Sequence, residues 1–183
     1  MSTRTHATIE DLYHVHEDGK AEIVDGELVL MSPTGDLPGS AALEIALSLR
    51  GYARKTRIGR AYGDNVGFMV DLPNRDSFSP DAAFYVGPRT RGKFLTGAPI
   101  FAAEVRSQED YGRSAEQKMA QKRADYFAAG TLAVWDVDVL RYKVIRCYRA
   151  DHPDAPRVFQ CGEIADAEPA LPGWNMPVDD LFV

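Results

Sequence analysis

Two acidic residues stand in otherwise apolar stretches of this chain. Asp81 directly follows Pro80 and begins an alternating, strand-like run that ends at Val86. Glu104 lies near the end of a second strand-like run, Ile100–Arg106. Burying an acid among apolar residues costs several kcal/mol unless the acid is paired or binds a cation. If the two runs pair as antiparallel strands, the start of the first lies beside the end of the second, and the two carboxylates meet.

Two carboxylates that meet in this way repel each other and require a cation. Hard oxygen ligands with open coordination positions suit Mg²⁺ or Mn²⁺, which retain water and accept phosphate oxygen as a further ligand. The pattern therefore predicts a divalent-metal site at Asp81 and Glu104. A structural reading stays open, in which Glu104 only forms an ion pair with Arg106 or another base at the strand end.

The helix expected at 114–129 carries a lysine in an unusual place. At 100° per residue, four of its residues share one narrow stripe, which consists of Ala115, Met119, Lys122 and Tyr126. A lysine in such a stripe extends its charged end towards solvent or meets an anion. Lys122 is therefore a candidate for the site.

Arg106 is a competing candidate for the cation of the site. It stands two residues after Glu104, and the alternation of a strand places both on one face. A guanidinium stays protonated, so it can hold a phosphate with two hydrogen bonds but cannot accept a proton from water. Arg106 and Lys122 are therefore competing candidates with different chemistry.

The sequence pattern also predicts the elements that position these residues. Asp25-Gly26 between two apolar runs is a strong hairpin signal. Helices are expected at 8–17, with Thr8 and Asp11 as its start signal, at 40–54, and at 114–129 before Gly130. Strands are expected at 60–63, 66–71, 81–86, 100–106, 131–138 and 142–149. Residues 32–39 and the proline-rich tail read as loops, with the tail docking through Trp174, Leu181 and Phe182.

Composition sets the class of protein. A chain of 183 residues, 45% hydrophobic and 26% charged, is expected to form one mixed α/β domain over residues 1–183. It has neither an apolar stretch of membrane-spanning length nor an apolar N-terminal signal, so we expect a cytoplasmic protein. The net charge of -6 argues against a protein that coats nucleic acid, but allows a carboxylate metal site. Basic residues form two groups, which read either as a nucleic-acid track or as solvated faces: Arg50, Arg54, Lys55, Arg57 and Arg60, and Arg89, Arg91 and Lys93.

Taken in order along nearly the whole chain, several segments resemble the Uma family of restriction-endonuclease-like proteins. They are Glu22–Leu28, Met31-Ser32-Pro33, Pro80-Asp81, Glu104-Val105-Arg106-Ser107, Asp110, Lys122, Tyr126, Gly130, Ala133–Asp138, Leu171–Trp174 and Asp180–Phe182. The family belongs to the PD-(D/E)XK superfamily. The resemblance implies a restriction-endonuclease-like α/β (α+β) fold, in which helices flank a central mixed sheet and a β-hairpin precedes it.

The same resemblance implies an Mg²⁺-dependent, endonuclease-like hydrolase that cleaves nucleic-acid phosphodiesters. Asp81, Glu104 and the backbone carbonyl of Val105 are then expected to hold Mg²⁺ or Mn²⁺. Arg106 stands where the superfamily motif has its lysine, and Lys122 on the following helix takes that lysine's place. On this reading we expect Arg106 to bind substrate and Lys122 to serve the chemical step. Tyr126 is expected to position Lys122, and Glu22 beside the hairpin is a candidate for a supporting role.

Two other functions remain open at this point. One is a non-cleaving nucleic-acid-binding or regulatory module on a nuclease fold, and the other is a hydrolase of a small phosphoester. Asp136 and Asp138 share a strand face and are weaker metal candidates, because aspartate is common before a turn. The expected partners are nucleic acid, with DNA preferred, and a second copy of the chain, since a two-fold dimer suits duplex DNA.

Overall fold

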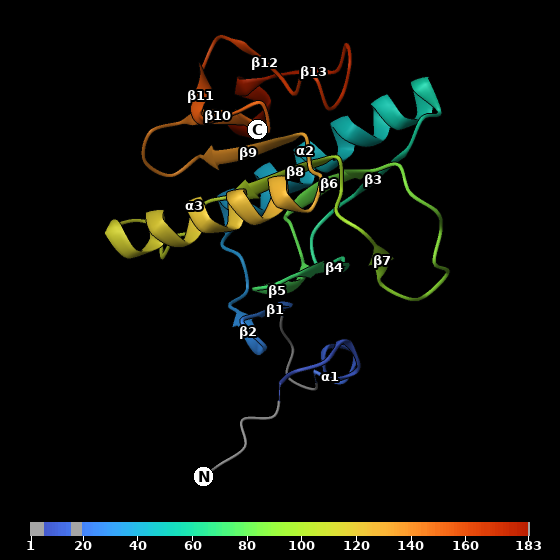
Figure 1. The fold of residues 1–183 in the computed structure, drawn as a ribbon. Helices are drawn as coiled ribbons and strands as arrows, with labels where there is room; N and C mark the ends of the chain where they lie inside the picture. Colours follow the sequence, from blue (N-terminus) through green and yellow to red (C-terminus); the bar gives the residue numbers. More distant parts are fainter. Residues whose placement is uncertain (1–5, 16–19, 183) are drawn as a thin grey trace.

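A six-stranded mixed sheet lies at the centre of the structure, a computed structural model that describes residues 6–15 and 20–182 (Figure 1). Its strand order is β11-β10-β9-β8-β6-β3. The strands are β3 (Arg60–Tyr62), β6 (Ala82–Tyr85), β8 (Phe101–Val105), β9 (Ala133–Asp138), β10 (Val144–Arg149) and β11 (His152–Gln160). The pair β8–β9 is parallel and the other pairs are antiparallel.

A five-stranded sheet in the order β2-β1-β5-β4-β7 forms a second layer. Its strands are β1 (Lys20–Val24), β2 (Glu27–Met31), β4 (Phe68–Leu72), β5 (Arg75–Phe78) and β7 (Leu95–Thr96). The expected hairpin is confirmed, with Asp25 and Gly26 at φ 51° and 72° in the turn between β1 and β2. The sequence pattern did not predict β5, because the buried residues Arg75 and Ser77 within it are polar.

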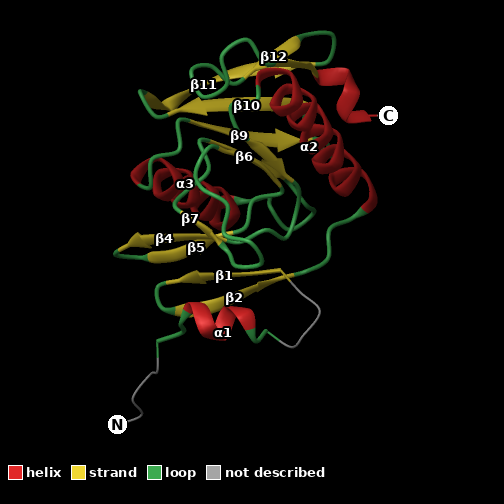
Figure 2. Cartoon of the chain, turned by 90° about the vertical axis from the view of Figure 1, so that its right-hand side faces the viewer, coloured by secondary structure: helices red, strands yellow, loops and turns green. Residues whose placement is uncertain are grey.

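The six-stranded sheet is covered on both faces, with α2 on one side and α3 on the other (Figure 2). Helix α2 (Asp36–Thr56) buries Ala41, Ile45 and Leu49 in the core that contains Phe101, Ala103 and Val105. Helix α3 (Arg113–Ala128) buries Tyr126 in a second core with Phe78, Ala102 and Val134. The alternation of β8 therefore directs Glu104 to the α3 side.

Helix bounds differ from expectation mainly at the start of α2 and at the end of α1. Helix α2 begins at Asp36 rather than near residue 40, because Pro38 fits in the first turn, where no helical partner exists for its missing N–H. Helix α1 (Ile9–Tyr13) has the expected capping box of Thr8 and Asp11 but is shorter than 8–17, of which residues 16 and 17 lie outside the described part. Helix α3 starts and ends within one residue of expectation.

The C-terminal segment covers the α2-side core. It contains β12 (Ile164–Asp166), β13 (Asn175–Pro177) and the 3-10 helix η1 (Val178–Phe182). Trp174 and Leu181 are buried there and Phe182 packs against the same core, so the expected docking is confirmed. Strand β11 contains Pro153 and Pro156 and was expected to be a loop. It is an edge strand, where a proline can face away from the neighbouring strand without losing a ladder hydrogen bond.

No helix among the described residues has both the length and the apolar content needed to cross a membrane.

Candidate active site

Asp81 and Glu104 lie side by side at one end of the β6–β8 pair, as the sequence predicts. The two strands are antiparallel with Ala82 opposite Ala103. The backbone N–H of Asp81 donates to the Ala103 carbonyl at 3.1 Å. Its carboxylate oxygen Oδ2 accepts from the Val105 N–H at 2.7 Å. The side chain thus continues the hydrogen-bond ladder beyond the end of β6, which fixes the carboxylate.

Both oxygens of Glu104 are held by α3. Its Oε1 accepts a hydrogen bond from the Tyr126 hydroxyl at 2.6 Å, and its Oε2 contacts the Lys122 Nζ at 2.8 Å. The Lys122 ammonium was expected within about 6 Å of this carboxylate, one water-bridged contact, and the direct contact confirms that geometry. Burial raises the pKa of Glu104, against the lowering effect of Lys122.

Lys122 joins the two sheets because its ammonium also contacts Glu22 of β1. The distance from Nζ to the Glu22 Oε1 is 2.9 Å. Burial opposes the charge of Lys122, but the carboxylates of Glu104 and Glu22 outweigh it and hold the pKa of Lys122 above its ordinary value. Lys122 is therefore a permanently charged group at neutral pH, suited to stabilising negative charge and not to accepting a proton.

Glu22 is fixed by a buried network that the sequence pattern did not reveal. Its Oε1 accepts from the Ser79 N–H at 2.8 Å, and its Oε2 from Arg75 at 2.7 Å. Arg75 also contacts Asp125 of α3 at 2.8 Å, which ties β5, β1 and α3 together. Burial opposes ionisation of Glu22, yet Lys122 and Arg75 together lower its pKa.

Lys20 is a second cation of the site and was not anticipated. Its Nζ contacts Asp81 Oδ1 at 2.6 Å and Asp64 at 2.8 Å. Burial opposes the charge of Lys20, but Asp81 and Glu104 raise its pKa above the ordinary value. One oxygen of Asp81 thus faces an ammonium, as one oxygen of Glu104 does.

These ammonium groups correct the expectation that the two acids repel each other without a metal ion. On that expectation, Asp81→Asn would leave stability unchanged or increase it in EDTA. Because Asp81 accepts from both Lys20 and the Val105 N–H, we now expect this variant to lose about 1–3 kcal/mol of unfolding free energy in EDTA, the usual contribution of hydrogen bonds to a charged group. Urea denaturation monitored by circular dichroism measures this difference. Asp71→Asn, which changes an exposed aspartate, is the control. A stability equal to wild type would restore the repulsion argument.

Arg106 does not take part in this group, contrary to expectation. Its guanidinium donates twice to Asp136, at 2.6 and 2.7 Å, and also to both carboxylate oxygens of Glu116 and to the Asp110 carbonyl. These contacts engage all five of its N–H donors, so none is left to hold a phosphate. The physical reason is the parallel neighbour β9, which places the buried Asp136 directly opposite Glu104.

Tyr126 also acts differently from expectation, since its hydroxyl holds Glu104 and not Lys122. Its ring stacks on Phe78 with the ring centres 4.0 Å apart, while the Lys122 Nζ lies 6.0 Å from its ring centre. Burial and the neighbouring Glu104 raise the pKa of Tyr126 well above its ordinary value, so the hydroxyl remains a donor.

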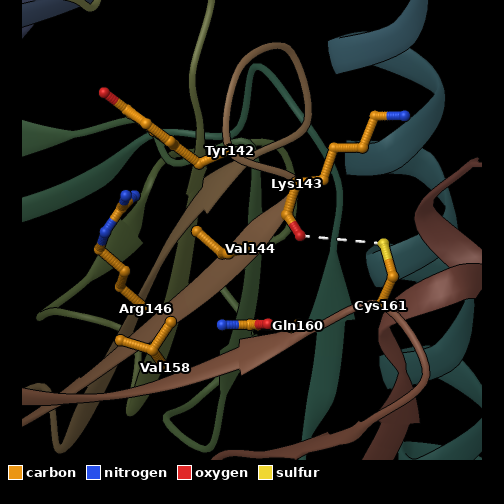
Figure 3. Close-up of a pocket in the computed structure, with 7 residues that line it drawn as sticks. All are labelled: Tyr142, Lys143, Val144, Arg146, Val158, Gln160 and Cys161. Carbon is orange, nitrogen blue, oxygen red and sulfur yellow. Dashed lines mark hydrogen bonds between the residues drawn. The ribbon is translucent and has the colours of Figure 1, made fainter.

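The side chains of the weaker candidates are engaged by residues outside this group. Asp136 is bound by Arg106, and Asp138 accepts from the Tyr111 hydroxyl and the Arg141 N–H. A surface pocket of about 490 Å³ lies over β10 and β11 (Figure 3) and contains none of the residues of the site. Its lining consists of Tyr142, Lys143, Val144, Arg146, Val158, Gln160 and Cys161.

The donor set fits a divalent ion that keeps much of its water. Within residues 6–15 and 20–182, no group of three or more His, Cys, Asp or Glu side chains is arranged to hold a metal ion. Asp81 and Glu104 each have one oxygen fixed by a protein N–H or O–H and the other on a lysine ammonium. Two carboxylates are the number that Mg²⁺ commonly takes from a protein when substrate and water supply the rest.

Comparison with known proteins agrees with this architecture. The family model of Uma2, described as putative restriction endonuclease, matches residues 7–179. A solved structure of a putative nuclease belonging to DUF820 from Anabaena variabilis ATCC 29413 is similar in fold, with a TM-score of 0.75 and 17% sequence identity. The similarity covers 96% of this chain and 97% of that one. No curated protein matches the chain. The chain thus has a restriction-endonuclease-like fold and belongs to the Uma2 family of putative restriction endonucleases.

Proposed function

We propose that this chain is a metal-dependent nuclease that hydrolyses phosphodiester bonds of nucleic acid. The observation that carries the proposal is that Asp81 just before β6, Glu104 of β8 and Lys122 of α3 converge at one end of the central sheet. Two carboxylates and a charged amine at a strand end are the groups that phosphodiester hydrolysis with Mg²⁺ requires. Membership of the Uma2 family supports the same reaction class.

Asp81, Glu104 and the backbone carbonyl of Val105 would hold Mg²⁺ or Mn²⁺. A divalent ion bound there polarises the phosphate and lowers the pKa of an attacking water. The Val105 N–H and the Tyr126 hydroxyl keep the two carboxylates in place. Lys122 would place its positive charge beside the phosphate oxygens as negative charge grows on them.

Glu22 and Lys20 support these groups in different ways. Glu22 holds the Lys122 ammonium at 2.9 Å and is itself held by Arg75. Lys20 occupies the oxygen of Asp81 that a metal ion would use, so metal binding requires it to move. We therefore expect Lys20→Met to bind Mn²⁺ more tightly than wild type, by about tenfold, since one charge–charge contact of order 1 kcal/mol no longer competes. Isothermal calorimetry measures this affinity, with Lys93→Met as the exposed control. An affinity that is unchanged or weaker would show that Lys20 does not compete.

The same two lysines favour one alternative, a nucleic-acid-binding module on a nuclease fold that does not cleave. In that case Lys20 and Lys122 permanently neutralise Asp81 and Glu104, and no metal ion enters. A single measurement distinguishes the two functions. Calorimetry with Mn²⁺ detects binding for the nuclease and none for the module.

Nicking of supercoiled plasmid tests the proposed reaction. Wild-type protein is expected to nick the plasmid with Mg²⁺ or Mn²⁺ and to be inactive in EDTA. Glu104→Gln keeps the shape of the side chain and removes its charge, so the nicking rate is expected to fall by at least about 10²-fold. Glu44→Gln alters a half-buried glutamate of α2 and serves as the matched control. Absence of nicking by wild type with either metal, on plasmid and on RNA, would exclude the nuclease.

Three further expectations from the sequence stay predictions. They are a single domain over residues 1–183, a homodimer and a cytoplasmic location.

A further inference from the structure

The charges of this acidic chain are strongly segregated. Two segments, 45–63 and 82–103, hold eight of its 21 Lys and Arg residues and none of its 27 Asp and Glu residues. A chain with a formal net charge of -6 thus contains two stretches that carry positive charge only.

The fold brings these two segments together. Strand β3 pairs with β6, with Arg60 opposite Tyr85, and the Arg60 guanidinium donates to the Gly87 carbonyl at the start of the following loop. A Cβ atom at Gly59 would lie 2.7 Å from the Tyr85 carbonyl oxygen, so the chain between α2 and β3 passes very close to the end of β6. Figure 1 shows the end of α2, β3 and the loop between β6 and β7 on the same side of the molecule.

Six exposed residues of these segments form what we call the basic pole: Arg54, Lys55, Arg57, Arg89, Arg91 and Lys93. In the part of the chain that the structure describes, none of the six forms an ion pair. By contrast, the half-buried Arg149 and the exposed Arg157 are paired with Asp151 and Asp166. Arg54 and Lys55 lie in the last turn of α2 and Arg57 is its C-cap residue, so these three charges also interact favourably with the helix dipole, but the other three residues lie outside any helix.

The basic pole is separate from the candidate active site. Asp81 immediately precedes β6, whereas Arg89, Arg91 and Lys93 follow its other end. A ligand that contacts both places therefore has to extend along the length of the strand.

We propose that the basic pole is a docking surface for the phosphate backbone of nucleic acid. A polyanion gains most from cations that are exposed and unpaired, because binding releases its condensed counterions without first breaking ion pairs in the protein. An extended polyanion can also reach from the pole to Asp81 and Glu104. The identity of the polyanion rests on the proposed function, while the surface itself rests on the charge distribution.

Binding of a fluorescein-labelled DNA duplex in EDTA, followed by fluorescence anisotropy over a range of NaCl concentrations, tests this proposal without any cleavage. Two double variants, Arg54→Gln/Arg57→Gln and Arg89→Gln/Arg91→Gln, are each expected to weaken binding about tenfold at low salt. Each is also expected to make the negative slope of log affinity against log salt shallower by about 2, which is one for each lost phosphate contact. Arg149→Gln/Arg157→Gln removes the same formal charge from paired arginines and is expected to leave the slope unchanged.

Equal losses in all three double variants would overturn the proposal, because only total charge would then matter. Binding to phosphatidylserine vesicles, without binding to DNA or RNA, would also overturn it. Failure of the proposed reaction is distinguishable. If the wild-type protein never nicks plasmid but the pole variants lose duplex affinity, the docking surface stands and the proposed function is refuted. If the protein nicks plasmid but the pole variants bind duplex like wild type, the proposed function stands and the docking surface is refuted.

Discussion

Replacing Lys122 by methionine is expected to lower the rate of metal-dependent nicking by at least about 10²-fold, with little change in duplex affinity measured in EDTA. The loss follows because, in the proposed reaction, the substitution removes a fixed positive charge beside the reacting phosphate. Rates of plasmid nicking at saturating metal concentration, normalised to folded protein, measure the effect. Lys118→Met lies one turn earlier on α3, is exposed, and provides the matched control.

The same substitution leaves Glu22 and Glu104 without their shared cation, so the variant is also expected to melt at a lower temperature. Lys122→Arg keeps the charge and separates the two effects. It is expected to melt near the wild-type temperature and to nick at a reduced but measurable rate. A folded Lys122→Met that nicks at the wild-type rate would remove Lys122 from the reaction.

Arg106→Met is expected to cost about 3–5 kcal/mol of unfolding free energy, the loss typical of a buried charge that is left without its partner. Asp136 is 1% exposed and receives two hydrogen bonds from Arg106, so the substitution leaves its buried carboxylate with only the longer 3.6 Å contact to Arg123 among its ion pairs in the described residues. Urea denaturation followed by tryptophan fluorescence measures the change, because Trp135 is fully buried next to Asp136 in β9.

Glu116→Gln is the control on the other partner of Arg106. The Glu116 side chain is 50% exposed, so its loss is expected to cost less than about 1 kcal/mol. An Arg106→Met protein with wild-type stability and weakened duplex affinity would instead support the phosphate contact expected from the sequence.

The residues with local sequence signals were predictable. Asp81 and Glu104 stand out because each is an acid in an alternating apolar run, and Lys122 because it interrupts a helical stripe. The antiparallel pairing of the two strands, which the sequence analysis assumed as a condition, then brings the two acids together. The hairpin at Asp25-Gly26 and the extent of α3 follow in the same way from turn chemistry and helical period.

The partners of these residues were not predictable, because their contacts link distant parts of the chain. Lys20 is 61 positions from Asp81, and Arg75 is 50 positions from Asp125. The error over Arg106 has the same origin. Alternation gives the face of a side chain but not the neighbour that it meets, and the parallel strand β9 supplies Asp136 there. Strand β11 was missed because only its place at the sheet edge makes Pro153 and Pro156 acceptable.

The arrangement of the site depends on the hairpin of β1 and β2 staying folded. It pairs with β5 through Val24 and Arg75, and its Glu22 forms an ion pair with Lys122. Asp81, Glu104 and Lys122 all belong to the central sheet and the helix packed on it. A local unfolding event that releases only the hairpin would therefore break the contact between the Lys122 ammonium and Glu22 while the central layer stays intact. Such partially open molecules would keep most of their secondary structure, while their Lys122 ammonium would be held by Glu104 without Glu22.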